Sequence, residues 1–303
     1  MTAFTNRCCG AIAAVVTGAL LLSACSSGSG GSGSASLHDQ LPEAIRKAGV
    51  IEVGASLTAA PVIFKSPDGQ PSGLDPDLAG ALEKVLGVKL EFQDVGPFAN
   101  VLPGLLSKKY DVAMSGITDT REREQGVDKD NKPVNDGVDF VDYFMAGFGM
   151  VVHKGNPKKI TKLDDLCGRT LVVKKGTIHD DFALSQQGAC ARLDKPLKLT
   201  ETDSDEKALS ALTSDDADVY LTDYPKAQYS AQSVDGGQSL EVAGAQFQPR
   251  PYGIALRKSD SKLRDVLTKA MNTLVRNGTY DSVLAKRQLS VGAVQNAVVN
   301  GSS

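Results

Sequence analysis

Short apolar runs of strand length alternate along the chain with segments of helical periodicity. The runs that predict strands are Val50–Ala55, Lys89–Val95, Asp111–Gly116, Gly149–His153, Thr170–Lys174, Lys198–Thr202, Asp218–Asp223 and Tyr252–Arg257. This alternation is typical of an α/β fold whose strands are mostly parallel. Of the 303 residues, 41% are hydrophobic, which is enough for the core of such a fold.

Helices are expected where apolar residues repeat at three- and four-residue spacing. Asp75-Pro76-Asp77 opens one of them, with a capping residue and a proline in the first turn, and Gly87 ends it. The others are Val101–Ser107, Asp205–Leu212, Ser261–Arg276 and Tyr280–Lys286. Residues 291–303 show neither pattern, and we expect a disordered tail there.

A unit of one helix followed by one strand occurs once in each half of the chain. It runs from Leu102 to Met114 in the first half and from Leu209 to Leu221 in the second. The repetition predicts two similar lobes.

The N-terminus has the features of an export signal. Arg7 precedes an apolar stretch that ends at Leu22 and is too short to span a bilayer. Leu22-Ser23-Ala24-Cys25 resembles a bacterial lipobox, so residues 1–25 are predicted to be a lipoprotein signal peptide with Cys25 acylated; the alternative is a plain signal peptide cut after Ala24. Residues 26–36 are almost only Ser, Gly and Ala, which predicts a flexible tether.

Two cysteines, Cys167 and Cys190, lie beyond the signal segment. In an oxidising compartment they are predicted to form a disulfide, with two buried free thiols as the alternative. The three histidines are scattered without ligand spacing, so we expect no metal site, and no cofactor motif occurs. A net charge of −3 gives no indication of a basic surface that would bind nucleic acid.

Polar residues follow the strands of both repeated units. In open parallel sheets, ligands bind beyond the carboxyl ends of the strands. That rule selects Ser115–Arg123 in one lobe and Thr222-Asp223-Tyr224 in the other. Arg123 can bind a carboxylate and Asp223 an ammonium, a pair that suits a zwitterion. The alternatives are a solvated arginine and an aspartate that only caps a helix.

Seven segments in order resemble the polar-amino-acid solute-binding proteins of ABC importers, which have the type II periplasmic-binding fold. They are Gly49–Gly54, Gly73–Leu78, Phe98–Leu105, Ser115–Arg123, Lys175–Thr177, Asp223 and Asn277–Tyr280. The resemblance covers about residues 40–290 and implies an extracytoplasmic binding protein, here held on the outer face of the cell membrane by its lipid anchor.

The resemblance also implies roles for individual residues. Gly116, Thr118 and Arg123 would bind the α-carboxylate of the ligand, and Asp223 its ammonium. Phe98 would form an apolar wall, and the loop at Thr177, where a helix begins, could also meet a carboxylate.

A hinged arrangement follows from the same resemblance. Lobe 1 is expected to comprise residues 37–143 and 252–290, and lobe 2 residues 148–247. Two crossing segments near 144–147 and 248–251 would absorb the rotation when the lobes close on the ligand. We expect a monomer that presents its closed form to the permease subunits of an ABC transporter.

The chain departs from the family pattern in two places. Ser56 and Ala59 replace an aspartate and an aromatic residue, which disfavours basic amino acids as ligands. Residues 125–137 form an additional polar segment, predicted to be a surface loop because Lys132 and Pro133 spoil a calcium-binding pattern.

Motifs of nucleophilic catalysis and phosphate binding do not occur in the sequence. The prediction is therefore a binding protein rather than an enzyme. The alternatives are a cyclohexadienyl-type dehydratase, which shares this fold, and a ligand-sensing module.

Overall fold

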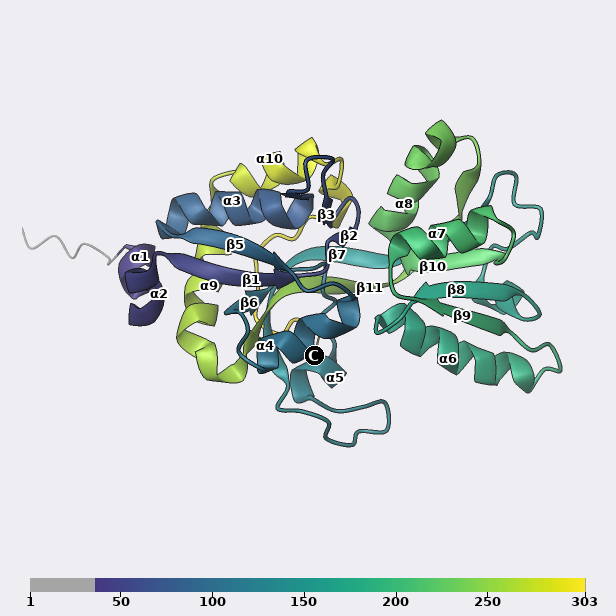
Figure 1. Ribbon diagram of the computed structural model, residues 1–303, viewed down its shortest axis with the longest axis horizontal. Coiled ribbons are helices and arrows are strands. Elements are labelled where there is room, and N and C mark those ends of the chain that lie inside the picture. The colour runs from purple at the N-terminus through teal and green to yellow at the C-terminus, as the bar shows by residue number, and fades with distance from the viewer. Residues whose placement is uncertain (1–35, 303) are drawn as a thin grey trace, which may run out of the picture. The chain divides into compact units, whose positions relative to one another are not determined.

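One sheet of eight strands organises the folded chain, seen in the computed structural model, which describes residues 36–302 (Figure 1). In spatial order the strands are β5 (Lys89–Asp94), β1 (Val50–Ala55), β6 (Val112–Ala113), β11 (Leu240–Arg257), β7 (Val138–His153), β10 (Val219–Asp223), β8 (Thr170–Lys174) and β9 (Lys198–Thr202). β1 is parallel to β5 and β6, and β8 is parallel to β9 and β10, while the pairing between β11 and β7 is antiparallel. The α/β prediction is confirmed.

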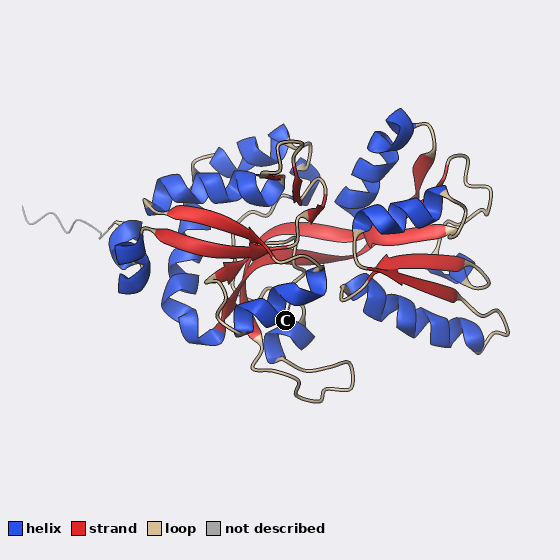
Figure 2. Cartoon of the chain, in the orientation of Figure 1, coloured by secondary structure: helices blue, strands red, loops and turns tan. Residues whose placement is uncertain are grey.

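Lobe 1, as we use the name, is the end of the sheet formed by β5, β1 and β6. Helices cover both of its faces (Figure 2). They are α3 (Leu74–Leu86), α9 (Ser261–Arg276) and α10 (Thr279–Lys286) in one core cluster and α4 (Val101–Leu106) in another, with the short helices α1 (Leu37–Gln40) and α2 (Glu43–Ala48) before β1. Ile51 and Val53 point into the first cluster and Ala113 into the second, as the two-residue period of strands requires.

The helix that begins near Asp75 ends at Gly87, as predicted, with that glycine in the left-handed conformation. Its beginning differs from the prediction. Gly73 holds the N-cap position without a side-chain hydrogen bond, and Asp75 lies inside the helix with its side chain buried. Asp75 is therefore available for another role, described below.

Lobe 2 is the other end of the sheet, formed by β10, β8 and β9. The helix α6 (Ile178–Ala191) packs on one face, and α7 (Asp205–Thr213) and α8 (Tyr224–Ser233) pack on the other. The predicted disulfide between Cys167 and Cys190 is present, with its Cα atoms 5.1 Å apart. It ties α6 to the segment that follows a short 3-10 helix, Leu163–Leu166.

The two segments that cross between the lobes are long paired strands. Sequence patterns predict only Gly149–His153 and Tyr252–Arg257 there, whereas β7 begins at Val138 and β11 at Leu240. The pairing of β11 with β7 is irregular between Ala243 and Gly253. The expected crossing segments 144–147 and 248–251 lie within this region.

The remaining elements are small. A second sheet contains β2 (Thr58–Ala59), β3 (Ile63–Lys65) and β4 (Pro71–Ser72), and the short helix α5 (Arg121–Gln125) precedes the loop formed by residues 126–137. Val134 of that loop is 61% exposed, so its side chain faces solvent.

The prediction of a disordered tail is wrong. Residues 291–302 pack on lobe 1, where Ala297 is buried and Val299 forms a β-bridge with Val141. The backbone N–H of Phe140 donates to Asn300 Oδ1 at 2.8 Å. The segment is held by backbone pairing and isolated side-chain contacts, which leave no periodic pattern in the sequence.

The predicted signal peptide with Cys25 and most of the predicted tether lie outside the described residues. Between residues 36 and 302, no helix combines the length and the hydropathy needed to cross a membrane.

Candidate functional site

The predicted site residues lie at or just beyond the carboxyl ends of four strands. Ser56 follows β1, and Gly116 and Thr118 follow β6; in lobe 2, Thr177 follows β8 and Asp223 ends β10. Ligand sites form at these ends in open α/β sheets.

Arg123 connects the two lobes. It belongs to α5, whose N-cap Thr120 accepts a hydrogen bond from the Arg123 backbone N–H at 3.2 Å. The guanidinium donates to the carbonyl oxygen of Thr118 at 2.7 Å and to that of Gly176 in lobe 2 at 3.4 Å. Its carbon lies 5.7 Å from the centre of the Phe98 ring. Three predicted residues therefore meet here, together with the loop before α6.

The charge of this guanidinium has no close partner. Within residues 36–302, no carboxylate lies within ion-pair distance of Arg123. Burial lowers its pKa, while the negative charges of Asp181 and Asp223 oppose that shift. A guanidinium that is partly withdrawn from water and bonded only to carbonyl oxygens is suited to receive a carboxylate.

Asp223 is buried and already paired. It stands at the N-cap position of α8, and Lys226, in the first turn of that helix, places its ammonium 2.7 Å from Asp223 Oδ2. Nε2 of His179 lies 3.5 Å from Asp223 Oδ1. Burial alone would raise the pKa of Asp223, but Lys226 and His179 bring it below its usual value. The predicted ammonium acceptor thus faces an ammonium from its own chain.

A second buried ion pair lies nearby in lobe 2. Lys174, the last residue of β8, is paired with Asp205, which also accepts a hydrogen bond from Tyr220. Against the effect of burial, Lys174 and Lys226 lower the pKa of Asp205 to about 2. The ammonium of Lys174 also lies 5.3 Å from the centre of the Phe98 ring. The predicted apolar wall therefore lies close to two cations, Lys174 and Arg123.

Gly116 makes a different contact from the one predicted. Its N–H donates to Asp75 Oδ2 at 2.9 Å, so this donor is engaged by the protein itself. Tyr143 donates to the other oxygen of Asp75 at 2.5 Å, and burial raises the pKa of this carboxyl to about 7. With φ at 56°, Gly116 occupies the left-handed region that favours glycine.

Ser56, Ala59 and Thr177 are buried in local structure. The Ser56 N–H donates to Ser115 Oγ at 3.1 Å, and Ala59 is part of β2. Thr177 is the N-cap of α6: its Oγ1 accepts from the Asp180 N–H at 3.3 Å and donates to the Lys174 carbonyl at 2.7 Å.

Two buried polar atoms near Asp223 lack a hydrogen bond within the described part of the chain. They are Nε2 of His179 and the hydroxyl oxygen of Tyr252. The Tyr252 hydroxyl interacts with the Asp223 charge without well-formed hydrogen-bond geometry. Buried polar groups are normally satisfied, so unpaired ones at a candidate site are suited to a ligand.

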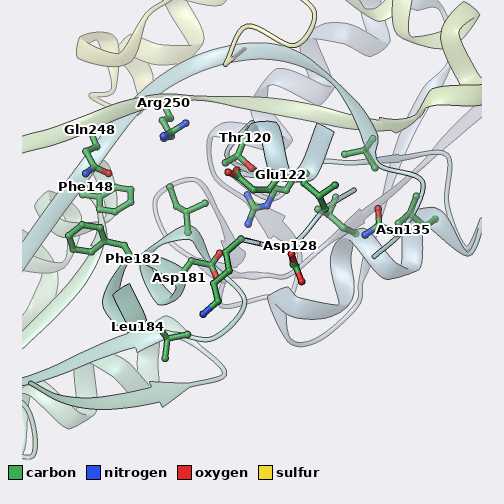
Figure 3. Close-up of a pocket in the computed structure, with 17 residues that line it drawn as sticks. Thr120, Glu122, Asp128, Asn135, Phe148, Asp181, Phe182, Leu184, Gln248 and Arg250 are labelled. Carbon is green, nitrogen blue, oxygen red and sulfur yellow. Dashed lines mark hydrogen bonds between the residues drawn. The ribbon is translucent and has the colours of Figure 1, made fainter. Parts of the chain in front are cut away.

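A cavity of about 530 Å³ opens beside Arg123 (Figure 3). Phe148, Asp181 and Phe182 of lobe 2 line it, and Asp128 from the loop 126–137 contributes to its wall. Arg123 is the only predicted ligand-binding residue among its lining residues. The loop thus reaches the boundary between the lobes, which its polar composition does not predict.

Sequence reasoning missed Lys174, His179 and Lys226 as site residues. Two signals were present in the sequence. Lys174 ends an apolar strand, so the strand-end rule applies to it, and Lys226 lies three residues after Asp223, a spacing that places two side chains on the same side of a helix. His179 has no comparable signal, because it lies within the first turn of a helix.

Comparison with known proteins is consistent with this geometry. A sequence model of the bacterial extracellular solute-binding proteins, family 3, matches residues 51–287. The arginine-binding protein ArgT of Corynebacterium glutamicum is 27% identical over 266 residues, covering 87% of this chain and 82% of the relative. A probable histidine-binding protein of Neisseria gonorrhoeae is 30% identical and covers 90% of this chain and 93% of the relative.

Solved structures give the same assignment. An ancestral arginine-binding protein bound to glutamine is 33% identical with a TM-score of 0.69, covering 80% of this chain and 98% of that chain. The ancestral amino-acid-binding protein AncCDT-1, described as a precursor of cyclohexadienyl dehydratase, is 32% identical with a TM-score of 0.68, over 80% of this chain and 97% of that chain. The protein described here belongs to the bacterial extracellular solute-binding proteins, family 3.

Proposed function

We propose that the protein captures an amino acid or a similar small carboxylate between its lobes and delivers it to an ABC importer. Arg123 carries this proposal, because its guanidinium reaches from lobe 1 to the Gly176 loop and has no carboxylate partner within residues 36–302. A ligand carboxylate placed there would also meet the N-terminus of α6, whose backbone dipoles favour negative charge.

Closure of the lobes is the mechanism that we propose. The ligand first binds lobe 1 through Arg123 and Phe98, and lobe 2 then adds the Thr177 loop and Asp223. A ligand that touches both lobes binds the closed form better and so shifts the population towards it. The irregular pairing of β11 with β7 between Ala243 and Gly253 supports rotation at this place.

The proposal is tested by Arg123→Ala in isothermal titration calorimetry with a panel of amino acids. Loss of a buried charge partner is expected to reduce binding by about 3–5 kcal/mol. Arg121→Ala is the matched control, since Arg121 lies in the same short helix and is exposed. Near-normal affinity in the Arg123 variant would rule out its role.

Binding without turnover is part of the proposal. The relatives described above are named as binding proteins, although AncCDT-1 is described as the precursor of a dehydratase. Nuclear magnetic resonance of the bound compound after prolonged incubation and release should show it unchanged. A dehydrated product would support the enzyme instead.

Attachment to the cell surface is proposed from the lipobox alone. Cys25→Ser should release the protein into the medium, or into the periplasm of a two-membrane cell, and should abolish labelling by a fatty-acid analogue. Retention of label in this variant would exclude Cys25 as the acylated residue. We further propose that the protein acts as a monomer.

A further inference from the structure

We infer that the region between the lobes around Arg123, Phe98, Lys174 and Asp223, called the cleft below, selects small dicarboxylates of the acidic-amino-acid class, and that Lys226 sets this selectivity. The inference rests on the proposed function, since it assumes that a small carboxylate binds in this cleft. It deepens that function by naming the class of ligand and a residue that no comparison assigns.

The positive and negative charges in the cleft do not balance. Three side chains supply positive charge, namely Arg123, Lys174 and Lys226. Asp223 is paired with Lys226, and Asp205 is paired with Lys174. Arg123 has no such partner within the described residues, so the cleft holds one uncompensated positive charge.

Neighbouring titratable groups do not cancel this excess at neutral pH. His179 is uncharged, because burial lowers its pKa to about 4. Burial raises the pKa of Asp75 to about 7, so this carboxyl carries only part of a negative charge at neutral pH, and it accepts hydrogen bonds from Tyr143 and the Gly116 N–H within lobe 1. Asp181 is exposed to solvent, so its interaction with Arg123 is screened.

Asp223, at the anionic end of the cleft, is already engaged by the protein. Asp223 Oδ2 faces Lys226 at 2.7 Å, and Oδ1 faces His179 at 3.5 Å. Lys226 is 6% exposed, so its ammonium does not reach water in this conformation. A ligand ammonium must share Asp223 with this lysine. This arrangement is favourable when the ligand has a second carboxylate, because that carboxylate can pair with the Lys226 ammonium.

Two cations lie at the wall where a ligand side chain would be placed. The Phe98 ring has the ammonium of Lys174 at 5.3 Å from its centre and the guanidinium carbon of Arg123 at 5.7 Å. A basic side chain brought to this ring would meet two like charges. Beside Asp223, the Tyr252 hydroxyl and Nε2 of His179 are buried without well-formed hydrogen bonds, and a hydroxyl can donate to a ligand oxygen. The two cations at the Phe98 ring and the hydroxyl near Asp223 therefore favour oxygen-rich, negatively charged groups.

The relatives named for arginine and histidine thus do not predict the ligand of this chain. Ser56, which stands where many members of the family carry an aspartate, removes one further negative charge from the lobe 1 side of the cleft. Its side chain is buried and interacts with Thr58 at 3.2 Å.

The experiment compares pairs of ligands of nearly equal shape by calorimetry on the purified protein. L-glutamate is measured against L-glutamine, L-aspartate against L-asparagine, and L-arginine is added as a basic ligand. We expect each acidic compound to bind at least tenfold more tightly than its amide and arginine to bind more weakly than both. Equal or tighter binding of an amide or of arginine would overturn the inference while leaving the proposed function intact.

Lys226→Met is the decisive variant. It should weaken glutamate binding at least tenfold and strengthen glutamine binding, because Asp223 then becomes free for the ligand ammonium. Lys207→Met is the matched control: it breaks an exposed pair with Asp203 at 2.8 Å and should leave all affinities unchanged. An unchanged ratio of glutamate to glutamine affinity in Lys226→Met would overturn the role of this lysine.

A double variant keeps the test valid if Lys226→Met fails to fold. Asp223→Asn combined with Lys226→Met removes both charges and leaves the net charge of the cleft as it was. We expect this protein to fold, as shown by circular dichroism, to bind amino acids more weakly because Asp223 no longer accepts the ligand ammonium, and to lose most of the preference for glutamate over glutamine because Lys226 is absent. A preference as large as that of wild type would contradict the role of Lys226. If wild-type protein binds none of these compounds, the proposed function itself fails.

Discussion

At the scale of single residues, the cleft contains more buried charge than a stable core tolerates without pairing. Lys174, Lys226, Asp205 and Asp223 are each less than 10% exposed. Removing water from isolated ions costs several kcal/mol per ion, so each of these groups depends on its partner. The two ion pairs are therefore stabilising only as pairs, and single substitutions within them affect folding as well as binding.

His179 gives a pH-dependent prediction at this scale. Burial lowers its pKa to about 4, whereas an unfolded histidine titrates near 6.5. Below pH 6.5 the unfolded chain binds a proton at this histidine, while the folded chain excludes it until the pH approaches 4. The unfolding free energy is therefore highest above pH 6.5 and falls as the pH decreases towards 4.

The variant His179→Gln removes this titration. Between pH 7 and pH 4.5, wild type should lose on the order of 2 kcal/mol of unfolding free energy relative to the variant. Urea unfolding of the ligand-free proteins at several pH values measures the difference. If the difference in unfolding free energy between wild type and variant does not change with pH, His179 is not held neutral in the folded state.

Individual site residues could be predicted where a strand-end rule applies to them. Asp223 ends β10 and Arg123 lies in α5, after β6; Arg123 and Lys174 lie near the same Phe98 ring, and Lys174 interacts electrostatically with Asp223. Their partners could not be predicted in the same way. A lysine three residues after an aspartate is common on solvated helices, and its burial here depends on tertiary packing, which no local pattern contains.

At the scale of elements, the disulfide joins α6 to the segment before β8. A bridge with a sequence separation of 23 residues restricts the unfolded chain and is worth about 3 kcal/mol. Cys167→Ala combined with Cys190→Ala should lower the unfolding free energy by this amount, as measured by urea denaturation. Wild type treated with a reducing agent serves as the comparison and should match the variant; a variant as stable as oxidised wild type would contradict the prediction.

The C-terminal segment gives a second prediction at this scale. Asn272 exchanges two hydrogen bonds with Ala297, and the Val294 N–H donates to the Tyr280 hydroxyl. Truncation after Leu289 removes these three hydrogen bonds and also the contacts of Val299 and Asn300 with β7, so it should cost more than about 3 kcal/mol, at roughly 1 kcal/mol for each bond. Thermal unfolding followed by circular dichroism measures the loss.

Two point variants separate packing from chain length in this segment. Ala297→Asp introduces a charge at a position that is 3% exposed and should destabilise the protein as strongly as truncation does. Val291→Asp changes a position that is 70% exposed and should be nearly neutral. Equal effects of both substitutions would argue against specific packing of the segment.

Elements with an apolar run or a clear helical period could be predicted closely. The strand at Val50–Ala55 and the helix at Ser261–Arg276 have the predicted bounds. β7 and β11 could be predicted only in part, since their inner portions carry glycine, proline and polar residues and are strands because they pair with each other. The C-terminal segment is ordered for a similar reason, by contacts with β7.

At the scale of the whole molecule, β7 and β11 make one hydrogen-bonded sheet of the two lobes. Ligand at 100 times its dissociation constant should stabilise the protein by about 2.7 kcal/mol. Because both lobes contact the ligand and share the sheet, calorimetric scanning should show a single transition that moves to higher temperature. Two transitions, of which one stays in place, would show that the lobes unfold independently.

The loop of residues 126–137 has a practical consequence. Asp128 and Asn135 line the cavity opposite Phe182, while Val134, between them in sequence, projects into solvent. A fluorophore coupled to a cysteine at position 134 would sit at the rim where the halves approach one another. Its emission would change when cargo is loaded, so this loop offers an attachment point for an optical sensor that leaves the cleft chemistry untouched.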